Sequence, residues 1–358
     1  MSTTQDLIIY GAGGNGIKFF NSLKDNGYNI IFFLDLYSKK QEHNGIKIYR
    51  PHTSPTKNCT VLISVSCYSR QIADDLKEQG YNICLDFNQC LKRFPTLLNQ
   101  FILPEKLLDC TNETKNNLNK IKNLNLMFKD EESKNALQRI LAFRLAPSSK
   151  TYIENDWQVQ YFPNDLPLSS VLKRPIVMLD CGAFTGDTLP IALSFFKKHK
   201  IDVSSISLFE PNLNNNVVLQ EVIEKFTTPE YLLINYPCGV WSKNTILNFE
   251  LGAETSHIVN TKSERSVQVP VVSLDAVAYG YQPNLIKMDV EGAEIEAIKG
   301  ARKIIRQYRP TLAISVYHKA SHLWEVAFLI NDINPNYNYY LRTHGDLGNE
   351  IILYALPT

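Results

Sequence analysis

The feature that most constrains this chain is the stretch 176–188, which has the pattern of a buried strand, a tight turn and a helix start. Residues 176–179 are continuously apolar, as in a parallel strand that is covered on both faces. Asp180 stands at the end of this strand, and Gly182 would let a ligand approach the backbone. Asp187 and Thr188 can cap the following helix. The stretch therefore predicts the ligand-binding end of an open α/β sheet.

The acidic residues of this loop distinguish it from a dinucleotide-binding loop. Asp180 and Asp187 flank two glycines, Gly182 and Gly186, whereas a pyrophosphate requires close backbone approach along its length and is repelled by carboxylates. A ligand with an ammonium group and a carboxylate on one carbon fits better, and S-adenosylmethionine is such a ligand. The next predicted strand ends at Glu210, which could accept both hydroxyls of an adenosine ribose.

A third strand–turn–helix pattern, LIKMDVEGAEIEAIKGA, occupies residues 285–301, and residues 309–318, RPTLAISVYH, form another strand that ends in a histidine. The chain closes with apolar runs at 339–344 and 350–355. From about residue 126 to the C-terminus, these motifs resemble the FkbM family of S-adenosylmethionine-dependent methyltransferases. The resemblance implies the class I methyltransferase fold, an α/β doubly wound sheet of seven strands whose last strand is antiparallel. It also implies methyl transfer, usually to a hydroxyl oxygen.

The resemblance also indicates where the cofactor would bind. A further strand is expected at 231–235, and at that position of the sheet the family places backbone near the adenine. We predict that S-adenosylmethionine contacts Asp180, Gly182, Ala183, Phe184, Gly186, Asp187, Thr188, Glu210, Pro211, Asn212, Gly239 and Val240.

The predicted catalytic residues are Asp289, Glu291 and His318, which follow two strands of the sheet. Methyl transfer from a sulfonium mainly requires alignment of the reacting atoms, but a hydroxyl acceptor must also lose a proton to a base. His318 is the candidate base because an imidazole titrates near neutral pH; a hydrogen-bonded structural histidine is the alternative. Asp289 would orient the substrate or lie near the sulfonium. Lys287 alternates into the sheet, so we expect it to form a structural ion pair.

We predict no metal site. Some small-molecule O-methyltransferases hold magnesium with acids at this sheet edge, and Asp289 and Glu291 could do so, but a metal-free site is the favoured interpretation. His318 and His322 have H-x-x-x-H spacing but lack the glutamate of a zinc-protease helix.

The beginning of the chain contains a second nucleotide-binding pattern. A short strand at 7–10 precedes GAGGNG at 11–16, and the next strand ends at Asp35, so a G-x-G-x-x-G motif is followed by an acid about 20 residues later. This predicts a smaller Rossmann-like α/β domain that holds a nucleotide through Gly11, Gly13, Gly16 and Asp35. It loosely resembles N-terminal domains of sugar-modifying enzymes that bind nucleotide sugars. A scaffold that has lost its ligand is the alternative.

The length of 358 residues favours two domains of about 150 residues each. We place the Rossmann-like domain at 1–90, a helical connector at 91–150 and the methyltransferase-like domain at 151–358. The connector contains a first-turn acidic run at 130–132 and an apolar helix face.

Composition and net charge limit the classes of binding partner and the cellular compartment that we expect for this chain. The formal net charge of +1 disfavours strong attraction to nucleic acid, and no apolar run approaches the ~20 residues of a membrane span. Seven cysteines without a C-x-x-C pair and the absence of a signal-peptide pattern indicate reduced thiols and a cytoplasmic protein. A homo-oligomer is compatible with the sequence.

The leading hypothesis is an S-adenosylmethionine-dependent O-methyltransferase that acts on a hydroxyl of a sugar, a nucleotide-linked sugar or a related glycan or natural product. One alternative is an NAD-dependent sugar-modifying oxidoreductase or epimerase that uses residues 11–16, although no Tyr-x-x-x-Lys dyad follows the N-terminal pattern. The other is a non-enzymatic nucleotide-binding scaffold. Glu210 and the loop at Asp180 argue against this for the second half of the chain.

Overall fold

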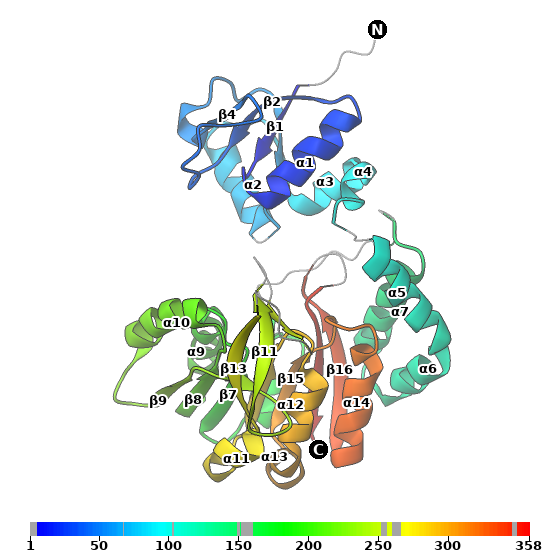
Figure 1. Cartoon of the computed structure of the whole chain (residues 1–358), viewed down its shortest axis with the longest axis vertical. Coiled ribbons are helices and arrows are strands. Elements are labelled where there is room, and N and C mark those ends of the chain that lie inside the picture. Colours follow the sequence, from blue (N-terminus) through cyan, green and yellow to red (C-terminus); the bar gives the residue numbers. More distant parts are fainter. Residues whose placement is uncertain are drawn as a thin grey trace. The chain divides into compact units, whose positions relative to one another are not determined.

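Alternating apolar strands and amphipathic helices build two α/β units in the computed structural model, which describes residues 6–66, 68–101, 104–148, 151, 160–251, 256–259, 266–345 and 349–358 (Figure 1). Unit 1 comprises Met1–Asn112 and Ala142–Asn155, and unit 2 comprises Glu113–Leu141 and Asp156–Thr358. No helix in the described part of the chain combines the length and apolarity needed to cross a bilayer.

Unit 1 contains a six-stranded sheet in the order β3-β4-β2-β1-β5-β6. Only β3 and β4 pair antiparallel; the other neighbours are parallel. The strands predicted from the apolar runs at 7–10 and 30–34 are present. The elements are β1 (Asp6–Tyr10), α1 (Gly14–Asp25), β2 (Asn29–Leu34), β3 (Glu42–His43), β4 (Ile46–Tyr49), β5 (Thr60–Ile63), α2 (Ser69–Glu78), β6 (Ile83–Leu85), α3 (Phe87–Arg93), α4 (Pro95–Leu98) and α5 (Pro104–Asn116).

Unit 2 is built on a seven-stranded sheet in the order β16-β17-β15-β14-β7-β8-β9. The last strand, β17, runs antiparallel to both β15 and β16, which is the reversed strand that the family resemblance implies. Parallel pairing joins β15, β14, β7, β8 and β9. The strands are β7 (Ile176–Cys181), β8 (Val203–Phe209), β9 (Leu232–Tyr236), β14 (Leu285–Met288), β15 (Thr311–Ser315), β16 (Tyr337–Thr343) and β17 (Ile351–Pro357).

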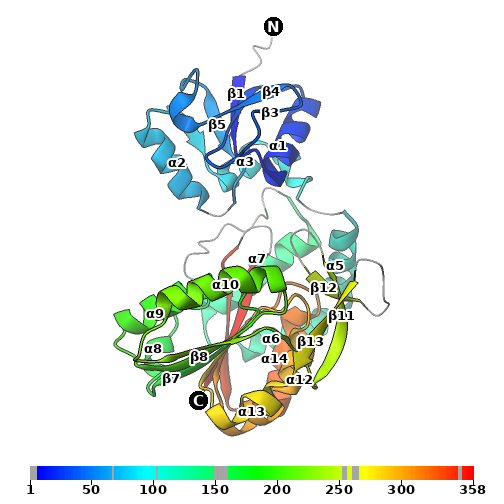
Figure 2. The ribbon, with the colours of Figure 1, turned by 60° about the vertical axis from the view of Figure 1, so that its left-hand side comes forward.

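Helices cover both faces of this sheet (Figure 2). On one face, Met178 and Ile206 pack with Phe196 of α9 and Leu219 of α10 in a buried cluster. The opposite face is covered by the helices that follow β14 and β15. The helices are α8 (Leu168–Val171), α9 (Thr188–Lys198), α10 (Leu213–Phe226), α11 (Leu274–Val277), α12 (Glu294–Gly300), α13 (Arg302–Tyr308) and α14 (His322–Ile333).

A second, four-stranded sheet of unit 2 has the order β10-β13-β11-β12. The strands are β10 (Gly239–Val240), β11 (Thr245–Leu251), β12 (Ser256–Val259) and β13 (Ser266–Val272).

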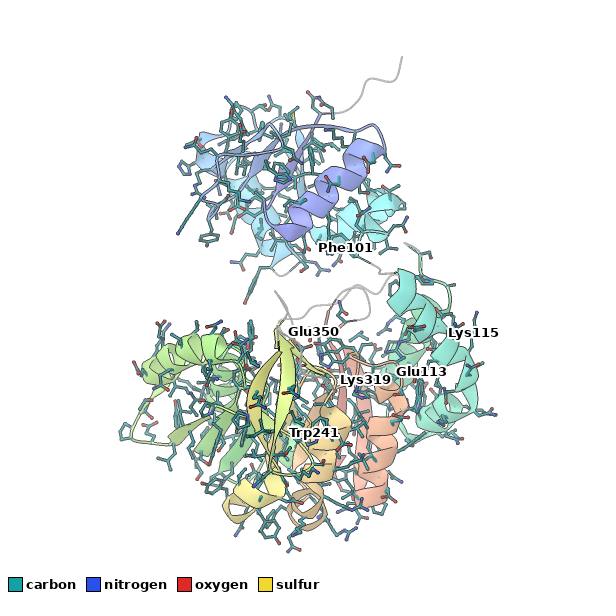
Figure 3. All side chains as sticks on the ribbon, viewed as in Figure 1. Phe101, Glu113, Lys115, Trp241, Lys319 and Glu350 are labelled. Carbon is teal, nitrogen blue, oxygen red and sulfur yellow. The ribbon has the colours of Figure 1, made fainter. Side chains whose placement is uncertain are left out.

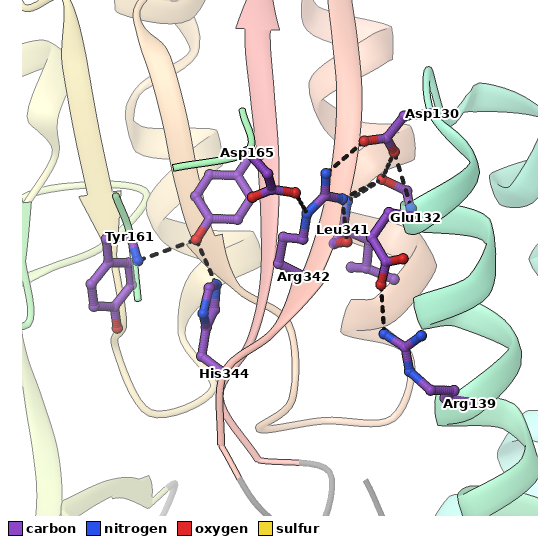
Figure 4. Close-up of polar contacts among 10 residues, drawn as sticks. Asp130, Glu132, Arg139, Tyr161, Asp165, Leu341, Arg342 and His344 are labelled. Atoms are coloured by element: carbon purple, nitrogen blue, oxygen red, sulfur yellow. Dashed lines mark hydrogen bonds and ion pairs between the residues drawn. The ribbon is translucent and has the colours of Figure 1, made fainter. Parts of the chain in front are cut away.

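The segment 113–141, which the sequence analysis placed in the connector, packs within unit 2. It contains α6 (Leu118–Met127) and most of α7 (Glu131–Leu145). The Lys129 N–H donates to the Tyr339 carbonyl at 3.0 Å, and Arg342 of β16 binds Asp130 at 2.6 Å and Asp165 at 2.7 Å (Figure 4). The three-part division at 90 and 150 stays a prediction.

The cysteines in the described residues are free thiols, as predicted: Cys59, Cys84, Cys90, Cys110, Cys181 and Cys238. Cys67 lies outside the described residues.

Candidate active site

A buried ion pair stands at the root of the loop that follows β7. Asp180 and Lys287 are direct neighbours in the pairing of β7 with β14, so their side chains leave the same face of the sheet. The two charges are 3.0 Å apart, and Lys287 also donates to the Gly182 carbonyl at 2.6 Å. This confirms the predicted structural ion pair. It also means that Asp180 holds the loop through Lys287.

Gly182 is required by the protein's own backbone. Its φ is +81°, and a Cβ at this position would lie 1.8 Å from the Asp289 carbonyl oxygen. The sequence suggests that this glycine admits a ligand to the backbone, whereas in the structure it avoids a clash with the Asp289 carbonyl. Because the Asp289 N–H donates to Cys181 O at 2.9 Å, the two strand ends stay in contact at this point.

The rest of the loop is a tight turn with an exposed tip. The Ala183 carbonyl accepts the Gly186 N–H at 2.8 Å, and Phe184, in the left-handed region at φ 49°, is 51% exposed. Asp187 occupies the cap position of α9 but makes no side-chain hydrogen bond there, so the predicted cap is wrong. Its carboxylate is exposed, while Thr188 is buried.

Glu210 ties the two predicted cofactor segments together at the end of β8. One carboxylate oxygen accepts the Phe184 N–H at 3.0 Å, and the other accepts the Asn212 N–H at 2.7 Å. The side chain of Asn215 adds a longer contact of 3.3 Å. Burial raises the pKa of Glu210, and these hydrogen bonds oppose that rise.

The remaining predicted cofactor residues lie beside Glu210. Asn212 caps α10 with its side chain, and Pro211 lies against Gly239, where an added Cβ would be 3.7 Å from the proline ring. Gly239 and Val240 form β10, and both are buried. The sequence-predicted cofactor residues thus gather at the ends of β7 and β8 and at β10.

The predicted catalytic residues converge at the ends of β14 and β15. His318 Nε2 lies 3.4 Å from Asp289 Oδ1 and 3.5 Å from Glu291 Oε2. The other ring nitrogen, Nδ1, is 2.9 Å from Glu294 Oε1. One imidazole therefore faces three carboxylates.

Glu294 is the buried centre of this cluster. It accepts the N–H groups of Val290 and Gly292, and its second oxygen is 2.9 Å from His322 Nδ1. Burial would raise the pKa of Glu294, but the contacts with His318 and His322 lower it. The structure therefore places Glu294 between two histidines.

The acids around His318 set its charge. Burial alone would lower the pKa of this imidazole, but the hydrogen bond to Glu294 and the charges of Asp289 and Glu291 raise the pKa to about 9. The surrounding acids therefore favour the protonated form of His318. The expectation that it titrates near neutrality needs this correction.

Two further residues, which the sequence does not assign to the site, interact with Asp289 or with its neighbours. Tyr161 donates its hydroxyl to Asp289 Oδ2 at 2.7 Å. Glu350, labelled in Figure 3, accepts the Tyr317 hydroxyl at 3.1 Å, and burial together with the charge of Asp289 raises its pKa to about 7. Both lie far from Asp289 in sequence, and no local pattern marks them. A third polar residue, His344, does not contact Asp289 in the structure but binds the Tyr354 hydroxyl at 2.8 Å (Figure 4).

In unit 1 the predicted nucleotide loop is held by the protein itself. An added Cβ on Gly16 would lie 1.9 Å from the Gly11 carbonyl oxygen. Asp35 accepts the Ala12 N–H at 2.8 Å through one oxygen and the Tyr37 and Ser38 N–H groups through the other. An added Cβ on Gly13, by contrast, meets open space.

Comparison with known proteins shows what the second half of the chain is similar to. The model of the methyltransferase FkbM domain matches residues 180–346. The chain is similar to the structure of methyltransferase FkbM from Methylobacillus flagellatus KT, with 22% identity, a TM-score of 0.60 and coverage of 98% of this chain and 90% of that chain. At this identity the likeness shows the fold. A search of the curated proteins gave no match.

Weaker similarity extends to other methyltransferase structures. One is a precorrin-6y C5,15-methyltransferase from Geobacter metallireducens GS-15, with 11% identity, a TM-score of 0.32 and coverage of 55% of this chain and 90% of that chain. Another is an rRNA methylase from Streptococcus thermophilus, with 12% identity, a TM-score of 0.32 and coverage of 53% of this chain and 91% of that chain.

Proposed function

We propose that this protein is an S-adenosylmethionine-dependent O-methyltransferase of the class I fold. Its acceptor is a hydroxyl of a sugar, a nucleotide-linked sugar or a related glycan or natural product. The observation that carries the proposal is the meeting of two sets of residues in the segment that matches the FkbM domain. The Glu210-bound loop follows β7, and the Asp289–His318 cluster follows β14 and β15.

The residues of the loop fit an adenosyl sulfonium. Glu210 Oε2 accepts the Phe184 N–H and has a second lone pair for a ribose hydroxyl, whereas Oε1 accepts the Asn212 N–H and the longer contact from Asn215. The exposed carboxylate of Asp187 is free to approach an ammonium group, while the charge of Asp180 is matched by Lys287. When bound, S-adenosylmethionine supplies a methyl group that is already activated by its sulfonium.

The acceptor end requires proton removal. As the acceptor oxygen forms a bond to the methyl carbon, the carbon–sulfur bond breaks and the hydroxyl proton must pass to a base. We assign Asp289 and Glu291 to positioning of the hydroxyl and His318 to the proton. His318 accepts a proton only in its neutral form, so the proton that the surrounding acids favour on it must leave first.

Calorimetry on the full chain tests the cofactor assignment. Both S-adenosylmethionine and S-adenosylhomocysteine should bind at one site per chain and raise the unfolding temperature. No heat and no thermal shift with either compound would overturn the proposal.

The acceptor class has its own test. Purified protein with S-adenosylmethionine is supplied with free sugars, nucleotide sugars and hydroxylated polyketides, and formation of S-adenosylhomocysteine is measured. If only the hydroxylated polyketides are methylated, the acceptor is a polyketide hydroxyl and the saccharide part of the proposal is wrong.

Nucleotide binding by unit 1 stays a prediction. Native mass spectrometry of the full chain would reveal a retained nucleotide or nucleotide sugar. Gly13→Ala has room for its methyl group, so this variant should fold and would test whether the loop contacts the ligand. A chain that retains and binds no nucleotide would favour the scaffold alternative.

Cytoplasmic localisation is likewise proposed, on the basis of the free thiols in the described residues.

A further inference from the structure

Two atoms of the Asp289–His318 cluster stand out because they are buried without a hydrogen-bond partner among the described residues. They are His318 Nε2 and Asp289 Oδ1. The His318 side chain is only 10% exposed, and its Nε2 faces Asp289 Oδ1 at 3.4 Å and Glu291 Oε2 at 3.5 Å. These are ion-pair distances longer than a hydrogen bond, so two buried polar atoms face each other without the hydrogen bond that such atoms usually make, and this arrangement calls for an explanation.

The spacing of these atoms suits ligands of one cation better than a direct hydrogen bond. An N–H···O bond is commonly about 2.7–3.2 Å long. By contrast, a cation with bonds of about 2.0–2.2 Å holds neighbouring ligand atoms roughly 3.0–3.5 Å apart. Glu291 has a side chain that is 45% exposed, so it can adjust toward such an ion.

The partners behind these atoms have the arrangement that orients metal ligands. His318 Nδ1 is 2.9 Å from Glu294. When a cation displaces the Nε2 proton, the proton on Nδ1 stays on the Glu294 side and the Nε2 lone pair is directed at the other two carboxylates. Glu294 is itself fixed by the Val290 and Gly292 N–H groups. Tyr161 donates to Asp289 Oδ2 and so leaves Oδ1 available.

We propose that His318 Nε2 and the carboxylates of Asp289 and Glu291 bind one divalent cation, with Glu294 as a positioning residue. A mixed set of one imidazole and two carboxylates favours a first-row metal such as Mn²⁺ or Zn²⁺ over Ca²⁺. In the proposed reaction the cation would polarise the acceptor hydroxyl and so ease loss of its proton to water. With the cation bound, Nε2 has no lone pair for that proton, so the cation would take the place of His318 as the activating group. That role rests on the proposed function, whereas binding of the cation does not. The sequence names Asp289 and Glu291 as possible metal ligands but favours a metal-free site, because residue spacing does not show that the His318 ring faces these carboxylates.

Metal titration of the full chain tests the site without any methyl acceptor. Protein stripped with a chelator is titrated with MnCl₂, by calorimetry and by loss of the electron paramagnetic resonance signal of free Mn²⁺, and then with ZnCl₂. We expect one ion per chain. Asp289→Asn and Glu291→Gln should each weaken binding at least tenfold, and Glu294→Gln should weaken it by about 10–100-fold. Glu296→Gln, in the same helix but paired with Lys299, should bind as the wild type does.

The fold of each variant is checked by near-ultraviolet circular dichroism. Since Glu291 is half-exposed, Glu291→Gln keeps the test valid if the buried variants unfold. Absence of Mn²⁺ and Zn²⁺ binding by the wild type overturns the proposal, as does equal binding by wild type, Asp289→Asn and Glu291→Gln, which marks an adventitious ion. If the chain binds S-adenosylmethionine but no metal, the metal proposal fails and the proposed function stands. If it binds the metal but no S-adenosylmethionine, the proposed function fails and the metal site stands.

Discussion

The Lys287 ammonium lies 3.0 Å from the Asp180 carboxylate, and the two side chains are 4% and 1% exposed. Burial alone would lower the pKa of Lys287, but Asp180 and Asp289 raise it above its usual value, so the lysine stays charged. Because Lys287 also donates to the Gly182 carbonyl, this pair joins β7, β14 and the loop predicted to hold the cofactor.

Lys287→Met should destabilise unit 2 strongly. The substitution leaves Asp180 buried without its partner, which costs about 3–5 kcal/mol. Urea unfolding followed by tryptophan fluorescence measures this, since Trp241 and Trp324 both belong to unit 2. Arg302→Met breaks the exposed pair with Asp332 and should cost about 0–1 kcal/mol. Equal effects would show that the buried pair is not required.

Gly182→Ala should disrupt the junction of the two strand ends. The new Cβ would meet the Asp289 carbonyl oxygen at 1.8 Å at a φ of +81°, so the backbone must move, at a cost of at least about 1–3 kcal/mol. Gly280→Ala is the matched control, because nothing lies within 4 Å of its Cβ position. The same fluorescence-detected unfolding compares the two. A Gly182→Ala protein as stable as the control would contradict the observed contact.

Glu210→Gln should weaken binding of S-adenosylmethionine. Loss of hydrogen bonds to a charged group costs about 1.5–3 kcal/mol, or roughly 10–150-fold in affinity. Calorimetry measures the effect, with Glu221→Gln as a control because that acid is exposed on α10. Since Glu210 also binds the Phe184 N–H, thermal unfolding must accompany the measurement. Unchanged affinity in a folded Glu210→Gln protein would remove Glu210 from the cofactor site.

Acid should weaken the attachment of α7 to β16. Burial raises the pKa of Asp130, but hydrogen bonds from Arg342 and Ser133 hold it below its usual value in the folded chain. The stabilising contribution is therefore complete above the unfolded pKa of about 3.9 and is lost as the pH falls through the lower folded pKa. Urea unfolding of wild type and Asp130→Asn from pH 7 to pH 3 should converge at the acid end. A difference between them that is independent of pH would contradict the charge-based account.

Local patterns predicted much of the framework. The apolar runs at 7–10, 30–34 and 176–179 became strands β1, β2 and β7, because a strand buried on both faces leaves a continuous apolar signature. The pairing of Lys287 with a carboxylate was also predictable, since a charge that alternates into a sheet needs a partner.

Contacts between distant segments were beyond the reach of the sequence. Tyr161 binds Asp289, which lies 128 residues later in the chain, and no local sequence pattern links the two residues. The sequence singles out His318 as a candidate base, but its pKa depends on three carboxylates that converge on it only in the folded chain. The packing of helix α6 and the start of α7 within unit 2 was not predictable either, because the apolar face of a helix does not specify which surface it covers.

The Asp130–Arg342 contact and the Lys129–Tyr339 hydrogen bond bear on how the catalytic half can be produced alone. A truncated gene that starts at residue 151 would omit α6 and α7 and uncover one edge of the sheet at β16. Such a fragment should express poorly or aggregate. A fragment that starts just before residue 113 would keep these two helices. It would also contain residues 142–155, which belong to unit 1.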